Sequence, residues 1–320
     1  MNFNIFSTSY VGIDIGRYKV EGVRIKKDKE KIAITSKFSV PYSKKIFEGE
    51  ELKDENEIIS ALNKTGKNLK LNIEDFIVTS IFPDKTLFRQ ITLPKMPNKS
   101  QMINAVKFQI VKELSIPSEN ITVEVDVEEL EQQESVAAFI ARNEDIEKFK
   151  SIFSKALLPL PDIIDAGYMK FNYLVEEKIK NGISFITFED NTSTYLELFK
   201  DGKFLAIDST GGGADDLKDN NDVDAKIHYL QLSDEIQRLG RMMLSRYSLP
   251  SDNLKRIIFV SEKMDYVNIW SDLFKDVGLG ESKNYKEFLN LTDDIPLGAY
   301  NLAVRGALES AKIKFLPKKS

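Results

Sequence analysis

Short apolar runs alternate with charged turns through the first 81 residues. Residues 10–15, 20–25 and 32–40 are rich in β-branched and aromatic side chains, which predicts three consecutive strands. Residues 54–69 carry apolar side chains at helical spacing, and residues 76–81 form another short apolar run. The order strand, strand, strand, helix, strand combines a meander with a crossover, so it indicates an α/β layer with a mixed sheet.

Residues 86–157 have a different pattern, which predicts a small α+β subdomain inserted in that layer. A helix is expected to run from Ser100, its expected N-cap, to Leu114. Four apolar side chains recur in four-residue steps on one face of this helix: Met102, Val106, Ile110 and Leu114. Two alternating strands and a second helix complete the subdomain, at residues 121–127, 135–141 and 143–153.

The opening pattern returns in the second half of the chain. Three strands, a helix and a further strand are predicted at residues 183–188, 194–199, 204–208, 231–247 and 256–260. Two more helices are expected at residues 267–277 and 295–310. We therefore interpret the halves as two lobes with a cleft between them. The expected boundaries are residues 1–85 and 158–178 for the first lobe, 86–157 for the inserted subdomain and 179–320 for the second lobe.

Composition excludes several kinds of chemistry. The 320 residues include no cysteine and one histidine, so thiol catalysis and sites with several histidines are impossible. His228 is far in sequence from any nucleophile motif and is expected to be a packing residue. The formal net charge of −5 gives no support to a nucleic-acid surface. Neither a signal peptide nor an apolar run of about 20 residues is present, so we expect a cytoplasmic protein that meets the membrane only through partners.

One short motif has a specific chemical use. The segment Gly12–Val20 places Asp14 at the end of a strand and Gly16 in the turn that follows. A glycine turn can present backbone N–H groups to a phosphate, and the carboxylate can hold a water of bound Mg²⁺. The alternative is an ordinary strand end with a carboxylate in its turn. Arg17, Tyr18 and Lys19 are either phosphate contacts or solvated turn residues.

In this context the motif resembles the start of an actin-like ATPase fold, with ribonuclease H-like duplicated lobes and mixed five-stranded sheets. Within that superfamily the sequence resembles the PilM family, the cytoplasmic actin-like component of the type IV pilus assembly platform. The most discriminating segment has a Leu-Pro, helix, Ile-Pro order, seen here in Thr92–Pro97, Ala105–Gln109 and Ile116-Pro117. Further similar segments are Asp201–Lys203, Ser209–Leu217 and Ala303–Leu308.

The resemblance implies bound ATP and Mg²⁺, with Asp14 as the metal residue. In the second lobe it implies phosphate contacts from Glu189 or Asp190 and from the glycine corner Gly211, Gly212 and Gly213. The second motif is degenerate, because one register places Phe188 and Asp190 at its Asp and Gly positions, and the other places Glu189 and Asn191 there. Ser261-Glu262-Lys263 also stands where the family has adenosine-side glycines, so weak or structural nucleotide binding is expected, and no catalytic residue is assigned.

Asp165 follows the predicted crossover strand of the first lobe. Members of the superfamily often have an acid there that helps to orient water. A carboxylate at this place is equally suited to capping the helix that follows. Both interpretations remain open from the sequence.

The resemblance also implies a partner. In the PilM family, a cleft between the first-lobe core and the inserted subdomain holds the cytoplasmic N-terminal tail of the membrane protein PilN. The matching candidates for contact are Met102, Val106, Phe108, Ile110 and Leu114, unless they form the core face of their helix. The expected function is that of an adaptor, peripheral to the inner membrane and bound to a PilN-like protein and other platform components. The alternatives are an active ATPase and a cytoskeletal filament protein related to FtsA.

Overall fold

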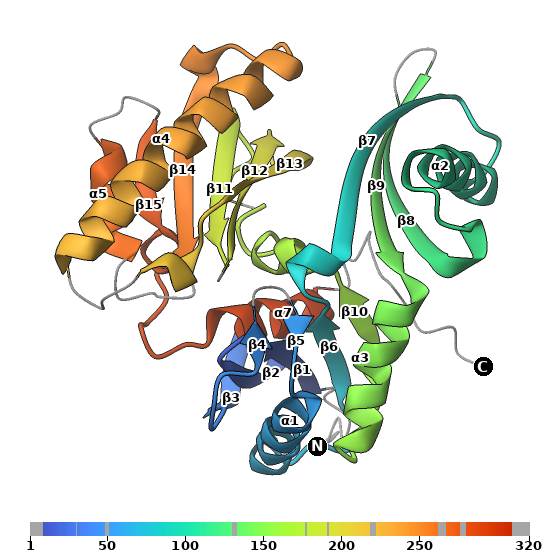
Figure 1. Cartoon of the computed structure of the whole chain (residues 1–320), viewed down its shortest axis with the longest axis vertical. Coiled ribbons are helices and arrows are strands. Elements are labelled where there is room, and N and C mark those ends of the chain that lie inside the picture. The colour runs from blue at the N-terminus through green and yellow to red at the C-terminus, as the bar shows by residue number, and fades with distance from the viewer. Residues whose placement is uncertain are drawn as a thin grey trace. The chain divides into compact units, whose positions relative to one another are not determined.

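The chain forms two compact units. The computed structural model describes residues 9–29, 31–48, 51–129, 133–176, 178–190, 192–217, 222–261, 267–275 and 280–308. Unit 1 comprises Met1–Tyr173 and Ile295–Ser320, and unit 2 comprises Leu174–Asp294 (Figure 1). No helix among the described residues is long and apolar enough to cross a membrane.

A five-stranded mixed sheet is the centre of unit 1. Its strand order is β10-β6-β1-β2-β3. β1 (Ser9–Ile15), β2 (Lys19–Asp28) and β3 (Lys31–Pro41) form an antiparallel meander, and β6 (Phe76–Ser80) and β10 (Ile163–Asp165) extend it in parallel. This is the mixed sheet that the sequence predicts. A short pair not predicted from the sequence, β4 (Phe47–Glu48) and β5 (Glu51–Leu52), follows the meander.

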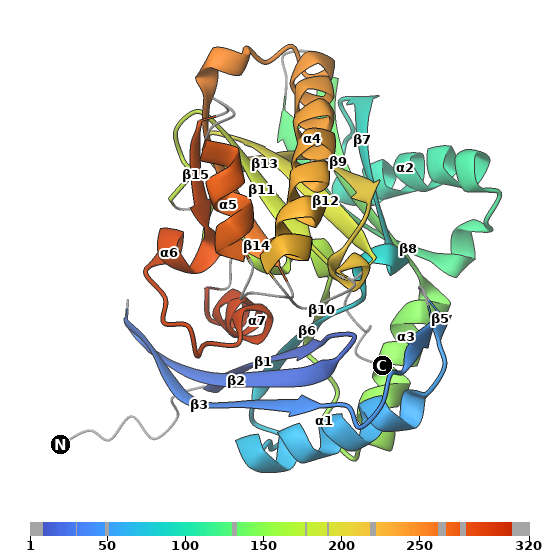
Figure 2. The same ribbon diagram turned by 60° about the vertical axis from the view of Figure 1, so that its left-hand side comes forward.

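Two helices cover opposite faces of this sheet (Figure 2). α1 (Glu55–Leu69) begins after Asp54, whose carboxylate caps the helix by accepting the Asn56 N–H, and its apolar stripe packs on β2 and β3. α7 (Leu297–Ala307) packs on β1, β2 and β6. A Cβ on Gly22 would meet Leu69 of α1, whereas a Cβ on Gly12 would meet Ala299 of α7.

The position of α7 corrects the expected domain boundaries. The sequence analysis assigned the chain from residue 179 to its end to the second lobe, but the segment from Ile295 belongs to unit 1, and the chain passes into unit 2 at Leu174. The physical reason is the small residues along the helix–strand contact. A Cβ on Gly12 would lie 1.9 Å from the Ala299 carbonyl oxygen, so only glycine allows β1 to approach α7 this closely.

The inserted subdomain is a three-stranded antiparallel sheet covered by a helix. Its strand order is β7-β9-β8, formed by β7 (Thr86–Pro94), β8 (Ile121–Glu129) and β9 (Gln133–Arg142). α2 (Lys99–Leu114) packs on this sheet, and α3 (Asn143–Lys155) leads back to α1. The small α+β insertion is therefore present as predicted, within unit 1.

Unit 2 repeats the sheet of unit 1. Its strand order is β13-β12-β11-β14-β15, again a three-stranded antiparallel meander followed by two parallel strands. The strands are β11 (Ile183–Glu189), β12 (Ser193–Lys200), β13 (Lys203–Gly211), β14 (Leu254–Ser261) and β15 (Glu281–Asn284). The helices are α4 (Asp222–Arg246), α5 (Val267–Lys275) and α6 (Tyr285–Leu289). The duplicated order confirms the pseudo-repeat.

Candidate functional site

Asp14 lies at the end of β1 and is held by a cation of its own unit. Both carboxylate oxygens lie close to the Lys170 ammonium, with Nζ at 3.0 Å from Oδ2 and 3.2 Å from Oδ1. Both side chains are buried. The carboxylate also lies against the first turn of α7, since a Cβ on Gly298 would be 1.7 Å from Asp14 Oδ2.

The turn after Asp14 is closed by its own hydrogen bond. The Gly16 N–H donates to the Lys19 carbonyl oxygen at 3.0 Å, so this amide is used inside the turn. The Arg17 guanidinium is buried, 4.9 Å from the centre of the Phe47 ring, and Lys19 forms an ion pair with Glu21 at 2.8 Å. Tyr18 is 41% exposed. Arg17 and Lys19, both expected near phosphate, thus have contacts within unit 1.

The matching turn of unit 2 decides the register that the sequence leaves open. Asp190 donates its N–H to the Ser193 carbonyl oxygen at 2.9 Å, just as Gly16 does to Lys19. The strand pair Glu189–Thr194 matches the pair Ile15–Val20. Phe188 therefore occupies the position of Asp14, and Asp190 that of Gly16. The Phe188 ring is buried and stacks on Tyr195 with ring centres 6.1 Å apart.

Glu189 points to the opposite face of the sheet, where α4 packs. Its fully buried carboxylate lies 2.9 Å from His228 Nε2 and accepts a hydrogen bond from the Tyr229 hydroxyl at 2.9 Å. The Ser261 hydroxyl also donates to it. Glu189, expected as a cofactor contact, is thus enclosed by donors within unit 2. His228 does pack as expected, but its contact with Glu189 is not visible from the sequence.

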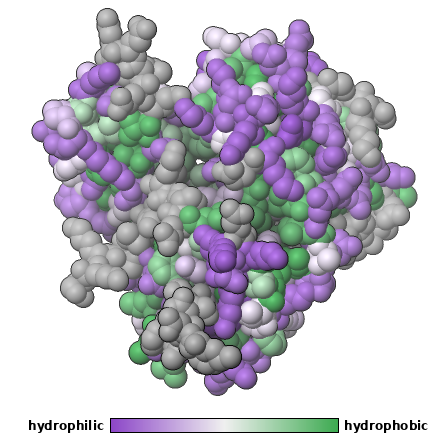
Figure 3. All heavy atoms as spheres, turned by 180° about the vertical axis from the view of Figure 1, so that it is seen from behind, coloured by the Kyte–Doolittle hydropathy of each residue, from purple (hydrophilic) through white to green (hydrophobic). Residues whose placement is uncertain are grey.

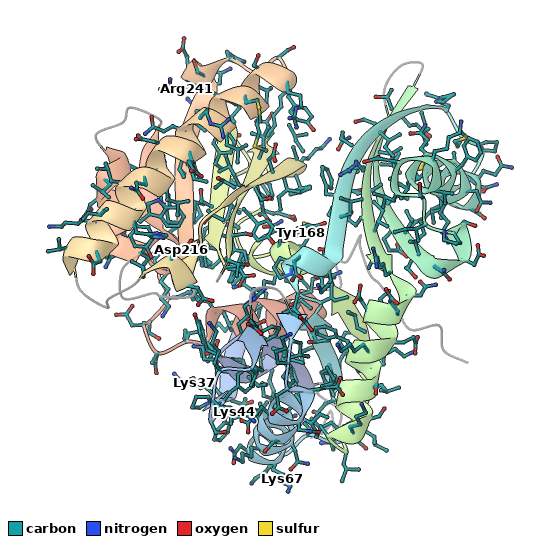
Figure 4. The ribbon with its side chains drawn as sticks, in the orientation of Figure 1. Lys37, Lys44, Lys67, Tyr168, Asp216 and Arg241 are labelled. Atoms are coloured by element: carbon teal, nitrogen blue, oxygen red, sulfur yellow. The ribbon has the colours of Figure 1, made fainter. Side chains whose placement is uncertain are left out.

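The glycine corner is also held from inside unit 2. Gly212 has a φ of +90°, which favours glycine, and its carbonyl oxygen accepts the Thr194 hydroxyl at 2.9 Å. The Gly213 N–H donates at 3.0 Å to the carboxylate of Asp216, a residue labelled in Figure 4. A Cβ on Gly211 would meet no atom within 4 Å. The Gly213 amide therefore faces an anion that the chain itself supplies.

Asp165, at the end of β10, is the third acid of the expected site. It is fully buried and receives hydrogen bonds from Arg305 Nε at 3.0 Å, from the Tyr173 hydroxyl at 2.6 Å and from the Ala166 N–H at 3.0 Å. Burial favours a lower pKa for Arg305, but the neighbouring Asp165 carboxylate outweighs it and raises the pKa of this guanidinium above its ordinary value. Asp165 therefore joins β10 to α7, and no side chain caps the 3-10 turn Gly167–Phe171 that follows.

Lys170 and Arg305 are the site residues that sequence reasoning missed. Each is a lone cation in an otherwise apolar stretch, Lys170 between Met169 and Phe171 and Arg305 within α7. A buried charge needs a partner of opposite sign, so these two cations could have been matched to the acids nearby. The sequence alone does not say which acid each one meets.

These contacts do not fit the Mg²⁺–ATP site that the resemblance implies. Mg²⁺ needs open oxygen ligands, whereas both oxygens of Asp14 face Lys170 and unit 2 has Phe188 at the matching position. Across the described ranges, no group of three or more acidic or histidine side chains is arranged to hold a metal ion. The tripeptide replacing the adenosine-side glycines lies partly outside the described residues, since Glu262 and Lys263 belong to 262–266. The same holds for Asn191.

A pocket of about 450 Å³ lies where the subdomain joins the rest of unit 1. This junction pocket is lined by apolar side chains from β7, α2, the loop after α2 and β8, among them Leu87, Leu114, Ile116 and Ile121. Its charged lining consists of Asp84, Lys85, Arg142, Glu144 and Asp145. Burial raises the pKa of the Asp145 carboxyl above its ordinary value. Figure 3 shows hydrophilic and apolar side chains mixed over the surface of the subdomain, at the upper left.

A second pocket, of about 280 Å³, shares Lys85 and Asp145 with the first. Three aromatic rings line this aromatic pocket, with the centres of Phe47 and Phe82 and of Phe82 and Phe149 each 5.3 Å apart. Two adjoining pockets with charged residues between them can accept an extended chain with apolar anchors.

The five candidate partner residues of α2 lie in three different environments: the core, the junction pocket and the exposed surface. Met102, Val106 and Ile110 are at most 4% exposed and form the core between α2 and the sheet. Leu114 is partly buried and lines the junction pocket. Phe108 is 64% exposed, with Lys112 Nζ 4.9 Å from its ring centre. Of these five side chains, Leu114 alone belongs to the pocket.

Comparison with known proteins identifies the fold. No protein-family model matches the sequence, and no curated protein matches it. A chain of the "PilM-PilN type IV pilus biogenesis complex" is similar over 94% of this chain and 98% of that chain, with a TM-score of 0.76 and 16% identity. This chain has the actin-like ATPase fold.

Two more distant structures agree with this fold. A Bacteroides thetaiotaomicron protein with an actin-like ATPase fold and unknown function matches with a TM-score of 0.50 and 8% identity, over 97% of this chain and 99% of that chain. The ethanolamine utilization protein EutJ from Carboxydothermus hydrogenoformans matches with a TM-score of 0.51 and 12% identity, over 92% of this chain and 89% of that chain. The expected PilM-like fold is therefore confirmed.

Proposed function

We propose that this protein is a cytoplasmic adaptor of the type IV pilus assembly platform. On this proposal it binds the cytoplasmic tail of a PilN-like inner-membrane protein in the junction pocket, and it meets the membrane and other platform components through that partner. The observation that carries the proposal is the pocket between the inserted subdomain and the rest of unit 1. The similarity of nearly the whole chain to a structure of a PilM–PilN complex supports it.

The pocket has the chemistry that an extended peptide requires. Its apolar lining offers anchoring positions, and Arg142 and Glu144 offer charged contacts to backbone or side-chain groups. The adjoining aromatic pocket suits a second apolar side chain further along the peptide. Weak or structural nucleotide binding is a separate question, because the junction pocket and Asp14 lie on different elements.

An active ATPase is the weaker alternative. Phosphoryl transfer needs metal ligands on both sides of the nucleotide and a positioned water or nucleophile. Asp14 faces an ammonium, and Asp165 and Glu189 are bonded by donors of their own units. Among the residues that the structure describes, no contact favours an FtsA-like filament protein.

Isothermal titration of the full chain with a synthetic PilN-like tail peptide tests the adaptor proposal. We expect binding by the wild type and a loss of at least tenfold in affinity for Leu114→Ala, which corresponds to about 1.4 kcal/mol. Arg142→Glu, at an exposed position of the pocket lining, should also weaken binding with little effect on folding. Phe108→Ala is the matched control, because Phe108 lies on the same helix outside the pocket.

The result that contradicts the proposal is equally clear. Absence of peptide binding by the wild type would exclude the adaptor function, and equal losses for Phe108→Ala and Leu114→Ala would place binding elsewhere. Steady ATP hydrolysis abolished by Asp14→Asn would favour the enzyme instead.

A further inference from the structure

Asp14 and Lys170 form a close and deeply buried ion pair. One ammonium lies within 3.2 Å of both oxygens of one carboxylate, and the side chains of Lys170 and Asp14 are 5% and 9% exposed. Moving a lone charge out of water costs several kcal/mol, so each ion needs the other at this depth.

The segment that carries Lys170 is fixed on both sides. It is a short 3-10 turn, Gly167–Phe171, in which every residue is buried. Its first residue packs tightly, because a Cβ on Gly167 would lie 2.3 Å from the Ile81 carbonyl oxygen. Tyr168 stacks on Phe139 of β9, with ring centres 6.3 Å apart. The backbone that positions the ammonium therefore has little freedom to swing away.

The space beside the Asp14 carboxylate is also filled by α7. Gly298 in the first turn of α7 leaves no room for even one methyl group beside Oδ2. Hydrated Mg²⁺ keeps several waters and needs an octahedral shell with metal–oxygen distances of about 2.0–2.1 Å. Such a shell and the Lys170 ammonium compete for the same carboxylate oxygens.

We propose that Lys170 is a built-in cation that takes the place of a divalent metal at Asp14. The charge of the β1 corner is then balanced by the chain itself, and unit 1 keeps its fold without Mg²⁺ or Mg²⁺–ATP. The role is structural and independent of partner binding, so it stands whether or not a tail peptide binds in the junction pocket.

Thermal unfolding of the full chain tests this role. The Tm of the wild type is expected to stay within about 1 °C between EDTA, MgCl₂, MgCl₂ with ATP and MgCl₂ with ADP, because a ligand that does not bind the native state does not stabilise it. Lys170→Met should lower the Tm by roughly 6–15 °C, since it leaves a buried carboxylate without its partner. MgCl₂ should then raise the Tm of Lys170→Met.

A variant that lacks both charges distinguishes charge balance at Asp14 from a packing role of the Lys170 side chain. Asp14→Asn/Lys170→Met is expected to recover about half or more of the loss and to show no response to MgCl₂. Lys150→Met is the matched control, since it removes a lysine whose partner Glu147 is 66% exposed, and its Tm should match the wild type. If Lys170→Met does not fold, two other measurements decide the outcome. They are the Tm of the double variant compared with that of Asp14→Asn, and the change in the wild-type Tm on adding MgCl₂.

Three results would overturn the proposal. The first is a wild-type Tm that rises by several degrees in Mg²⁺–ATP and loses this rise in Asp14→Asn. The second is a double variant no more stable than the less stable single variant, because the two charges would then not be coupled. The third is a folded Lys170→Met variant that MgCl₂ does not stabilise, because the ammonium would then not occupy a metal position.

Discussion

Glycines and buried charges meet at the contact between β1 and α7. Gly12 and Gly298 each leave space that a neighbouring backbone or carboxylate fills, and Asp14 and Asp165 each face a cation from another part of unit 1. These residues depend on one another, because the close approach of α7 brings Arg305 to Asp165 and Gly298 to Asp14.

Gly298→Ala tests whether the contact between α7 and Asp14 depends on the missing side chain at residue 298. The new Cβ would be 1.7 Å from Asp14 Oδ2, so the carboxylate or the helix must move, and we expect a loss of about 1–3 kcal/mol in unfolding free energy. Gly211→Ala is the control, because its Cβ would meet no atom within 4 Å, and its effect should stay within about 0.5 kcal/mol. Urea unfolding measures both. Equal stabilities of the two variants would contradict the packing described.

The environment of Asp75 predicts that the protein loses stability at acid pH. Burial favours a higher pKa for this carboxyl, but hydrogen bonds from Arg24, Ser9 and the Asn72 N–H outweigh it and hold the pKa below its ordinary value. The native state therefore binds this proton less tightly than the unfolded state. The resulting stability is fully present above the unfolded pKa of about 3.9 and is lost as the pH falls toward the lower native value.

Asp75→Asn should accordingly be less stable at pH 7, by about 1–3 kcal/mol, because Arg24 loses its charged partner. It should also lose less stability than the wild type between about pH 5 and pH 2.5, a window that brackets the unfolded pKa of about 3.9. Unfolding free energies measured across this range test the sign. Parallel curves for the two proteins would show that Asp75 does not contribute to acid unfolding.

At the scale of elements, the apolar stripe of α2 identifies one face of the helix but does not show whether that face packs on the core or binds a partner. The four-residue period correctly identifies one face of the helix, and the structure shows that this face packs on the subdomain sheet. The partner-binding interpretation of the same residues would have required that face to be open. A stripe at helical spacing does not distinguish the two cases, because both need apolar side chains in register.

Ile110 and Phe108 make this difference measurable. Ile110→Ala removes a side chain that is 1% exposed and should cost about 2–5 kcal/mol, whereas Phe108→Ala removes one that is 64% exposed and should cost less than about 0.5 kcal/mol. Hydrogen exchange of the β7–β9 amides should report the loss in the subdomain. A large effect of Phe108→Ala would indicate that this ring is covered by something in solution.

At the scale of the molecule, two units arise from a chain that crosses between them twice. Unit 1 is completed only when α7 returns at the end of the described chain, and unit 2 is built from one continuous segment. The single tryptophan, Trp270, is fully buried in unit 2 between Tyr229 and Phe259, with ring centres 5.2 and 4.7 Å away. Its fluorescence therefore reports the folding of unit 2.

A chain ended after Asp294 tests this division. We expect unit 1 to lose its cooperative fold, because the face of β1 that α7 covers becomes exposed, while Trp270 keeps the blue-shifted emission of a buried indole. Limited proteolysis should cut the strands and helices of unit 1 and spare those described for unit 2, according to the division into units. Retention of a protease-resistant unit 1 would show that α7 is not part of its core.

The sequence by itself determined most of the local elements, the duplicated order and the inserted subdomain, because periodicity and turn residues act over short distances. It also pointed to the actin-like fold and to Asp14. It did not predict β15, a short polar segment that pairs with β14, or the five-residue helix α6, which packs on β14 and β15. Nor did it determine the side on which α7 packs, the register at Phe188 or the partners of the buried acids. The contacts of Asp14 with Lys170 and of Asp165 with Arg305 join residues more than 100 positions apart, and the register at Phe188 depends on strand pairing, so only the tertiary structure decided them.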